Sequence, residues 1–223
     1  DADAAYYEMM AMVGEDFMKE YTKAHYSEFS NDNTPLAWRL PTFNDYYSLS
    51  GIEYRDDSDY TGYSYATNYA FGAWLARKHG GAAMMNHIVN STDTDYFTAV
   101  INSVLATTGA TFTIETLLRD FAYDCIVNAS TNGFAQAVSV SSTDALYNAE
   151  KSYGYPLTAI PLWNLGSVIT STTTTKDTFG RTTTGTLSGL DGPYLFGAEY
   201  VASAGVRPYG MELQKVGTIA SGA

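Results

Sequence analysis

The sequence predicts an α+β fold: a mainly helical subdomain over residues 1–150, followed by a small β-rich module over residues 151–223. Two observations support this division. Before residue 150, apolar residues recur at the three- and four-residue spacing of helices that bury one face. After it, the chain is rich in Gly, Thr and Ser, with the short apolar alternations typical of strands. With 223 residues, the chain is long enough to bury a sizeable core.

The first helix is expected over residues 3–24, where the carboxylate of Asp1 or Asp3 can accept hydrogen bonds from its first N–H groups. Gly14 is its weak point, worth about 1 kcal/mol against alanine. Its buried face carries apolar side chains at helical spacing: Met9, Met12, Val13, Phe17 and Tyr21. Residues 25–61 then form a long connection that is functional, partly helical around residues 44–49, or both. A connection of that length without structure of its own is unusual in a compact domain.

Four more helices are expected over residues 63–79, 82–89, 94–107 and 113–127. Gly80 and Gly81 stop the first of these, since glycine readily adopts the left-handed conformation. Asp93 or Thr94 can cap the third, and Thr113 the fourth. The inward residues of the third are Phe97, Val100, Ile101, Val104 and Leu105; those of the fourth are Ile114, Leu117, Leu118, Phe121, Ala122 and Cys125. The position of Cys125 in this stripe indicates a core thiol.

The β-rich module is expected to contain strands near residues 160–168, 172–175, 195–201 and 211–219. A carbohydrate-binding role for it is a minor alternative to an ordinary packed core. The aromatic residues that could stack on a sugar there are Trp163, Tyr194, Phe196 and Tyr200.

Composition excludes several function classes. The net charge is −12, which argues against binding nucleic acid through its phosphates. No transmembrane segment is expected, because there is no run of 18 apolar residues. The single cysteine excludes an internal disulfide. A surface rich in Tyr, Thr, Ser, Asn and Gly and poor in Lys resembles exported bacterial proteins, at the cell surface, in the periplasm or outside the cell.

Metal sites are expected to be incomplete within this sequence. His25, His79 and His87 are far apart, and none belongs to a His-Glu-x-x-His pair. His79 ends a helix, where an imidazolium favours the negative end of the dipole. The loop segments 31–33 and 56–59 offer the oxygen ligands that calcium prefers, but without the Gly and distal Glu of an EF-hand.

Glu8 is the most suggestive residue for function. A carboxylate within an apolar, Met-rich helix costs several kcal/mol unless it is paired or bound to a metal. Glu8 and Glu15 lie seven residues apart and therefore share one helix face. The spacing alone leaves two interpretations open: Glu8 is exposed while the methionines face the core, or Glu8 serves a metal.

Three segments resemble a family of peptidases. The first reads Tyr-Glu-Met-Met-Ala-Met-Val-Gly-Glu-Asp over residues 7–16, the second runs from Tyr63 to Gly81, and the third is the helix over residues 113–127. They are similar to zinc metallopeptidases of the gluzincin type, and specifically to hyicolysin-like peptidases and related spirochaetal surface lipoproteins. Ala5 stands where the family has Trp, Tyr7 where Asn is usual, and the His-Glu-x-x-His motif is not in this chain.

The resemblance implies that the helical part is the C-terminal subdomain of such a peptidase. It makes Glu8 the third ligand of a zinc ion whose two histidines lie outside this sequence. Tyr63, or alternatively Tyr65, is then the catalytic hydroxyl that stabilises the oxyanion. Glu15 or Asp16 then orients a histidine ligand. Alone, this chain is expected to be catalytically silent.

Two functions follow as expectations. The first is the C-terminal portion of an exported zinc-metallopeptidase-like protein, whose partner is the missing N-terminal part of the same protein. The second is a non-catalytic surface, filament or lattice protein that kept the scaffold and binds another surface protein. Its acidic surface, rich in Tyr and Thr, suits contacts made by aromatic anchors.

Overall fold

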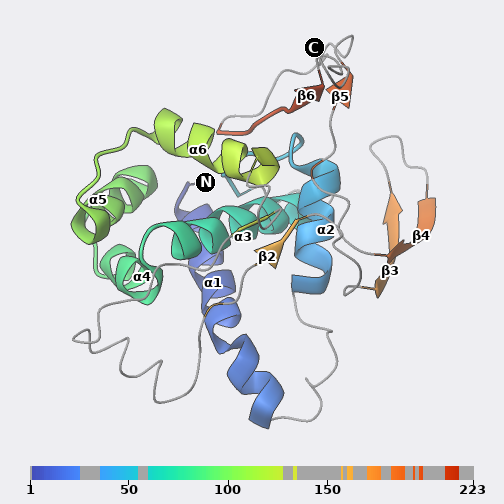
Figure 1. The fold of residues 1–223 in the computed structure, drawn as a ribbon, viewed down its shortest axis with the longest axis horizontal. Helices are drawn as coiled ribbons and strands as arrows, with labels where there is room; N and C mark the ends of the chain where they lie inside the picture. The colour runs from blue at the N-terminus through green and yellow to red at the C-terminus, as the bar shows by residue number, and fades with distance from the viewer. Residues whose placement is uncertain are drawn as a thin grey trace, which may run out of the picture.

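A computed structural model describes residues 2–25, 36–54, 60–127, 133–134, 157, 160–162, 170–176, 182–188, 193, 196–197 and 209–215. This part of the chain is mainly helical, as the sequence predicts (Figure 1). The helices are α1 (Ala2–His25), α2 (Leu36–Tyr46), α3 (Thr61–Lys78), α4 (Gly81–Val89), α5 (Tyr96–Thr108) and α6 (Ile114–Val127).

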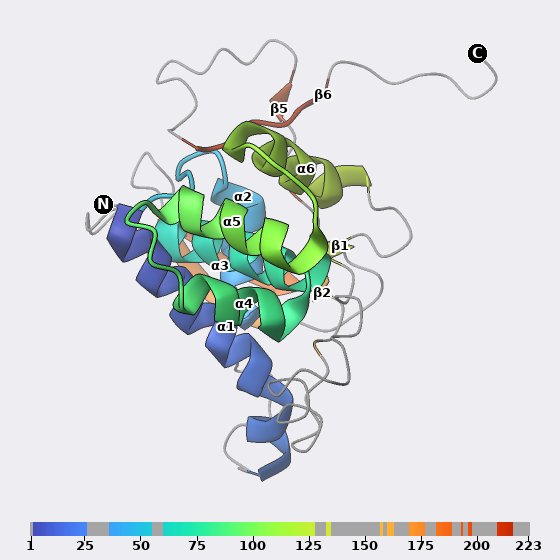
Figure 2. The same cartoon turned by 90° about the vertical axis from the view of Figure 1, so that its left-hand side faces the viewer.

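Helix α3 is the centre of the fold, with α1, α2, α4 and α6 arranged around it (Figures 1 and 2). The sequence predicts a single buried side for this helix, but every residue from 66 to 77 is buried. Small side chains explain the difference, because they let neighbouring helices approach closely from several directions. They are Ala66, Ala70, Gly72, Ala73 and Ala76.

Helix α1 packs tightly against α3 at Gly72. A Cβ atom added there would lie 2.6 Å from both Met9 Cγ and Val13 Cγ2. The predicted buried face of α1 is confirmed at Met9, Met12 and Val13. The interface fixes how α1 lies on α3 and so determines which residues of α3 can reach the first turns of α1.

Gly14 of α1 and Gly72 of α3 are expected to respond oppositely to replacement by alanine. Nothing lies within 4 Å of a Cβ at Gly14, so Gly14→Ala is expected to raise the free energy of unfolding by about 1 kcal/mol through helix propensity alone. Gly72→Ala overpacks the α1–α3 contact and is expected to lower the free energy of unfolding by about 1–3 kcal/mol. Urea unfolding of the two variants measures both effects, and a stabilised Gly72→Ala would contradict this packing.

Helix α2 is a correction to the sequence prediction, which placed only a short helix near residues 44–49. The observed helix begins at Leu36, ends at Tyr46 and contains Pro41. A proline inside a helix removes one backbone hydrogen bond. Burial of Leu40 and Phe43 in the common core stabilises the helix in spite of this loss.

The other helix ends follow local capping chemistry. Gly80 and Gly109 adopt left-handed φ angles of 112° and 71°, and the sequence predicts such a stop at Gly80. Thr113 Oγ1 accepts from Thr116 N at 3.3 Å and caps α6. The cap of α5 is Asp95, not Asp93 or Thr94, since Asp95 Oδ2 accepts from Thr98 N at 2.8 Å.

An aromatic cluster joins α3 to α6. Phe121 lies with its ring centroid 5.4 Å from those of Phe71 and Trp74. Trp74 Nε1 donates to Asp124 Oδ2 at 2.8 Å, and Lys78 Nζ binds the same oxygen at 2.9 Å. The inward stripe predicted for α6 is buried at Leu117, Phe121 and Cys125, whereas Leu105 of α5, also predicted inward, is exposed.

The described strands form three pairs, two antiparallel and one parallel. β1 (Gly133–Phe134) pairs with β2 (Ile160–Pro161) and β3 (Thr170–Lys176) with β4 (Thr182–Ser188), both antiparallel. β5 (Phe196–Gly197) runs parallel to β6 (Gln214–Lys215). A separate β-rich module stays a prediction, because residues 135–156 and much of the chain after them lie outside the described part.

Parts of the tail pack on the helices. Leu157, Ile160 and Leu162 belong to the same core as the helices. Asn44 Nδ2 donates to the carbonyl oxygen of Leu162 at 2.9 Å, and Ile52 N to that of Tyr209 at 3.2 Å. The helical core therefore includes side chains from beyond residue 150.

Some sequence predictions lie outside the described residues. They are the calcium-type segments 31–33 and 56–59, the boundary at residue 150, and the stacking side chains of Trp163, Tyr194, Phe196 and Tyr200.

Candidate functional site

Glu8 lies at the edge of the buried face of α1. Its neighbours Met9 and Met12 are fully buried, whereas Glu8 itself is partly exposed. Residues about one turn apart share a helix face. Ala5, Glu8 and Met12 therefore lie along one side of α1, at the edge of its contact with α3. The carboxylate is thus neither free in solvent nor enclosed in the core.

Two tyrosine hydroxyls meet at this position. The hydroxyl of Tyr65 on α3 lies close to the side chains of Tyr54 and Glu8, close enough for both to shift its pKa. The rings of Tyr54 and Tyr65 lie edge to face, with centroids 5.7 Å apart. The Tyr54 hydrogen bond, burial and the charge of Glu8 raise the pKa of Tyr65 to about 12. At neutral pH the Tyr65 hydroxyl therefore stays protonated and is a hydrogen-bond donor.

Tyr54 is held beside Tyr65 by bonds between its loop and α3. Asn68 Nδ2 donates to the Glu53 carbonyl oxygen at 2.9 Å. Ser50 Oγ and Ser64 Oγ are 3.1 Å apart and hydrogen-bonded. Tyr54 has no signal in the sequence, because nothing in a loop sequence indicates which residue of a helix it will meet.

Tyr63 occupies a different place from Tyr65. Its ring stacks on Tyr46 of α2, with centroids 4.5 Å apart, and lies edge to face with Tyr60. Two residues along a helix correspond to a rotation of about 200°, so Tyr63 and Tyr65 project from nearly opposite sides of α3. Of the two candidates from the sequence, Tyr65 is the one that the fold brings to Glu8.

Glu15 and Asp16 are each bound by an arginine. Asp16 forms a bidentate pair with Arg77 of α3, at 2.6 Å to Nη1 and 3.0 Å to Nη2. Glu15, whose side chain is 48% exposed, pairs with Arg39 Nη1 of α2 at 2.7 Å. Both carboxylates therefore connect α1 to its neighbours. A role for either beside a histidine ligand stays a prediction.

His79 is part of the core rather than a charged helix end. Its ring lies edge to face with Trp74 and Phe112, at 5.1 and 5.3 Å. Burial, followed by the charge of Lys78, lowers the pKa of His79 to about 4. The prediction that His79 is a charged imidazolium is thus wrong at neutral pH, because desolvation of the ring outweighs its attraction to the helix dipole. Cys125 is also buried, which raises the pKa of its thiol well above the usual value, consistent with a core residue.

The low pKa of His79 predicts an acid-sensitive fold. Between pH 6.5 and 4 the unfolded chain takes up a proton at His79 that the folded chain does not, so stability falls as the pH falls through this window. The loss reaches about 3 kcal/mol near pH 4. His79→Phe, which keeps the aromatic contacts, is expected to remove this part of the slope. Parallel curves of unfolding free energy against pH for the two proteins would contradict the prediction.

The donor set of the site fits one ligand of a shared metal ion. Among the described residues, no group of three or more His, Cys, Asp or Glu side chains is placed to hold a metal. Glu8 is the carboxylate of the Tyr54–Tyr65 cluster, and a carboxylate that accepts one hydrogen bond keeps further lone pairs for a metal. A metal ion held by Glu8 would need its remaining ligands from residues beyond this cluster.

Comparison with known proteins adds no assignment. No protein-family model matches the sequence, and neither curated proteins nor solved structures give a match. Of the helices described, none combines the length and apolar character that crossing a membrane requires.

Proposed function

We propose that this chain is the C-terminal portion of an exported zinc-metallopeptidase-like protein, in which Glu8 is the third zinc ligand. Two histidines and a general base come from the N-terminal part of the same protein, which is the proposed partner. The observation that carries the proposal is the meeting of Glu8 with the Tyr65 hydroxyl across the α1–α3 contact.

The arrangement matches what peptide hydrolysis needs from this half of a site. A metal-bound carboxylate needs a hydrogen bond that fixes its orientation. An oxyanion needs a protonated donor that is held in place before the reaction. Tyr65 is protonated at neutral pH, and Tyr54 holds its hydroxyl. The sequence motif around Glu8 and the structural position of Tyr65 support the same assignment independently.

Zinc, when bound, polarises the scissile carbonyl and lowers the pKa of its water to about 7. The residues of this chain act around it. Glu8 contributes a negative charge and an oxygen ligand. The single proton of the Tyr65 hydroxyl is donated to Glu8 in the free site and to the oxyanion of the substrate during the reaction. The α1–α3 contact at Gly72 keeps the two side chains in register.

The role of Tyr65 is tested by removing single hydroxyls in the full-length protein. Tyr65→Phe is expected to lower kcat by about 10²–10³ with little change in KM, because the lost bond forms mainly in the transition state. Tyr63→Phe is the matched control, since it removes the same atom on the other side of α3. It is expected to change kcat by less than about threefold.

Zinc content of both variants distinguishes catalysis from metal loss. Full zinc occupancy with a low kcat in Tyr65→Phe supports the proposal. A large loss in Tyr63→Phe with none in Tyr65→Phe would overturn the assignment and favour Tyr63 instead.

A second candidate is a non-catalytic surface or lattice protein on the same scaffold. Exposed tyrosines favour it, because aromatic side chains anchor protein contacts. Tyr7, Tyr123 and Tyr209 are all exposed. Absence of zinc from the full-length protein, together with assembly into filaments or sheets, would favour this function over the first.

A further inference from the structure

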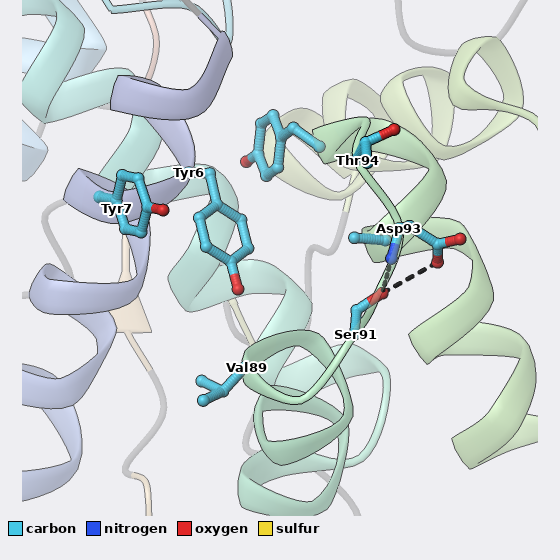
Figure 3. Close-up of a pocket in the computed structure, with 8 residues that line it drawn as sticks. Tyr6, Tyr7, Val89, Ser91, Asp93 and Thr94 are labelled. Carbon is cyan, nitrogen blue, oxygen red and sulfur yellow. Dashed lines mark hydrogen bonds between the residues drawn. The ribbon is translucent and has the colours of Figure 1, made fainter.

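A pocket lies beside the first turns of α1, facing the segment that connects α4 to α5. Its volume is about 460 Å³, within the range of small-ligand sites. Figure 3 shows Tyr6 and Tyr7 on one side and Ser91, Asp93 and Thr94 on the other, with Val89 at the end of α4. The pocket therefore joins segments that are more than 80 residues apart in the sequence.

The walls of the pocket are fixed by contacts of their own. The Tyr6 hydroxyl donates to the carbonyl oxygen of Ile88 at 3.0 Å, which ties α1 to α4. The ring of Tyr6 lies edge to face with those of Tyr7 and Tyr96, at 5.3 and 5.8 Å. Tyr96, which also lines the pocket, is largely buried, and its hydroxyl donates to Met9 Sδ at 3.0 Å. A ligand would thus meet a preformed aromatic wall.

Asp93 is held on the facing wall. Its Oδ2 accepts from Ser91 Oγ and from Asn102 Nδ2 of α5, both at 2.9 Å. Among the described residues, no hydrogen bond reaches Oδ1. The carboxylate is therefore oriented by neutral donors and keeps one oxygen for a ligand.

The chemistry of the walls selects for positive charge. Of the described residues that line the pocket, none is lysine or arginine, and one is an aspartate. The faces of tyrosine rings attract cations. Tyr7 is 69% exposed, so its ring is available to a ligand. The net charge of −12 adds a long-range attraction for cations.

We propose that this pocket binds the basic side chain of a peptide, with the ammonium or guanidinium group between the tyrosine rings and Asp93. The stem of three methylenes in arginine or four in lysine suits a pocket with an aromatic wall and an acidic far side. The site is separate from the Glu8–Tyr65 cluster and needs no metal. Its test is therefore independent of the proposed peptidase function.

The test is an NMR titration of the 223-residue chain at low salt with the peptide acetyl-Ala-Arg-Ala-amide. The comparison peptide carries citrulline, which has nearly the same shape as arginine without its charge. The arginine peptide is expected to shift the resonances of Tyr6, Tyr7 and Ser91 and to bind at least about fivefold more tightly than the citrulline peptide.

Two variants locate the site. Asp93→Asn keeps an oxygen for Ser91 and Asn102 and removes only the charge, and Tyr7→Ala removes an exposed ring. Each is expected to weaken binding of the arginine peptide at least about fivefold. Glu115→Gln, which removes an exposed charge on α6, is expected to leave it unchanged. Equal affinity for both peptides, or no shift at millimolar peptide, would overturn the proposal. So would tighter binding of methyl glucoside than of the arginine peptide, which would identify a carbohydrate site.

Discussion

Replacing Arg77 with methionine is expected to lower the free energy of unfolding by about 3–5 kcal/mol. Arg77 and Asp16 have side chains that are 1% and 3% exposed, and they form two hydrogen bonds between α3 and α1. Arg77 Nη1 also donates to the Ala73 carbonyl oxygen at 3.0 Å. Methionine fills most of the space but leaves the Asp16 carboxylate buried without its counter-charge, which is the costly state.

Two further variants identify the cause of this loss. The double variant Asp16→Leu with Arg77→Met removes both charges and is expected to recover most of the stability, since an apolar pair often replaces a buried ion pair at little cost. Arg119→Met breaks an exposed pair with Asp120 and is expected to change stability by less than about 0.5 kcal/mol. Chemical denaturation measures all three. If Arg77→Met were as mild as Arg119→Met, the buried pair would not hold α1 on α3.

The same ion pair affects its surroundings. Burial, and then the charge of Asp16, raise the pKa of Tyr69 well above its usual value. Arg39 lies over the ring of Tyr69, 5.5 Å from its centroid. Charged side chains from α1, α2 and α3 therefore meet around one buried tyrosine, where the sequence predicted only an apolar helix face.

The helices could be predicted where local signals determine them. The spacing of Met9, Met12 and Val13 and the left-handed stops at Gly80 and Gly109 are properties of a few neighbouring residues. Helix α2 could not be predicted in this way. Pro41 is a local signal against a helix, and contacts with distant residues, among them the burial of Leu40 and Phe43, outweigh it. The complete burial of α3 is likewise a property of the assembled fold.

The site shows the same limit. The motif around Glu8 singled out the carboxylate, but the resemblance pointed to Tyr63 first and left Tyr65 as the alternative. The three-dimensional arrangement distinguishes them, because Tyr65 projects toward Glu8 whereas Tyr63 stacks on Tyr46. Tyr54 and the pocket beside Tyr6 and Tyr7 had no signal in the sequence, since both depend on segments that meet only in the folded chain.

Replacing Glu8 with glutamine is expected to weaken zinc binding by the full-length protein at least about 100-fold, more than the loss of an outer-shell partner would. Glutamine keeps the shape of the side chain and an oxygen that can accept from Tyr65, so the α1–α3 contact is preserved. It lacks the negative charge that a zinc ligand of this type supplies. The expected loss of zinc binding therefore reports lost coordination and not unfolding. Circular dichroism verifies that the variant is folded.

The most direct measurement is the zinc content per chain of the purified full-length protein, for the wild type, Glu8→Gln and the matched control Glu115→Gln. Glu115 is exposed at the start of α6, away from the Glu8 cluster. We expect one zinc per chain in the wild type and in Glu115→Gln, and almost none in Glu8→Gln after dialysis against a weak chelator. Undiminished zinc in Glu8→Gln, or a wild-type protein without zinc, would contradict the assignment of Glu8 as a metal ligand.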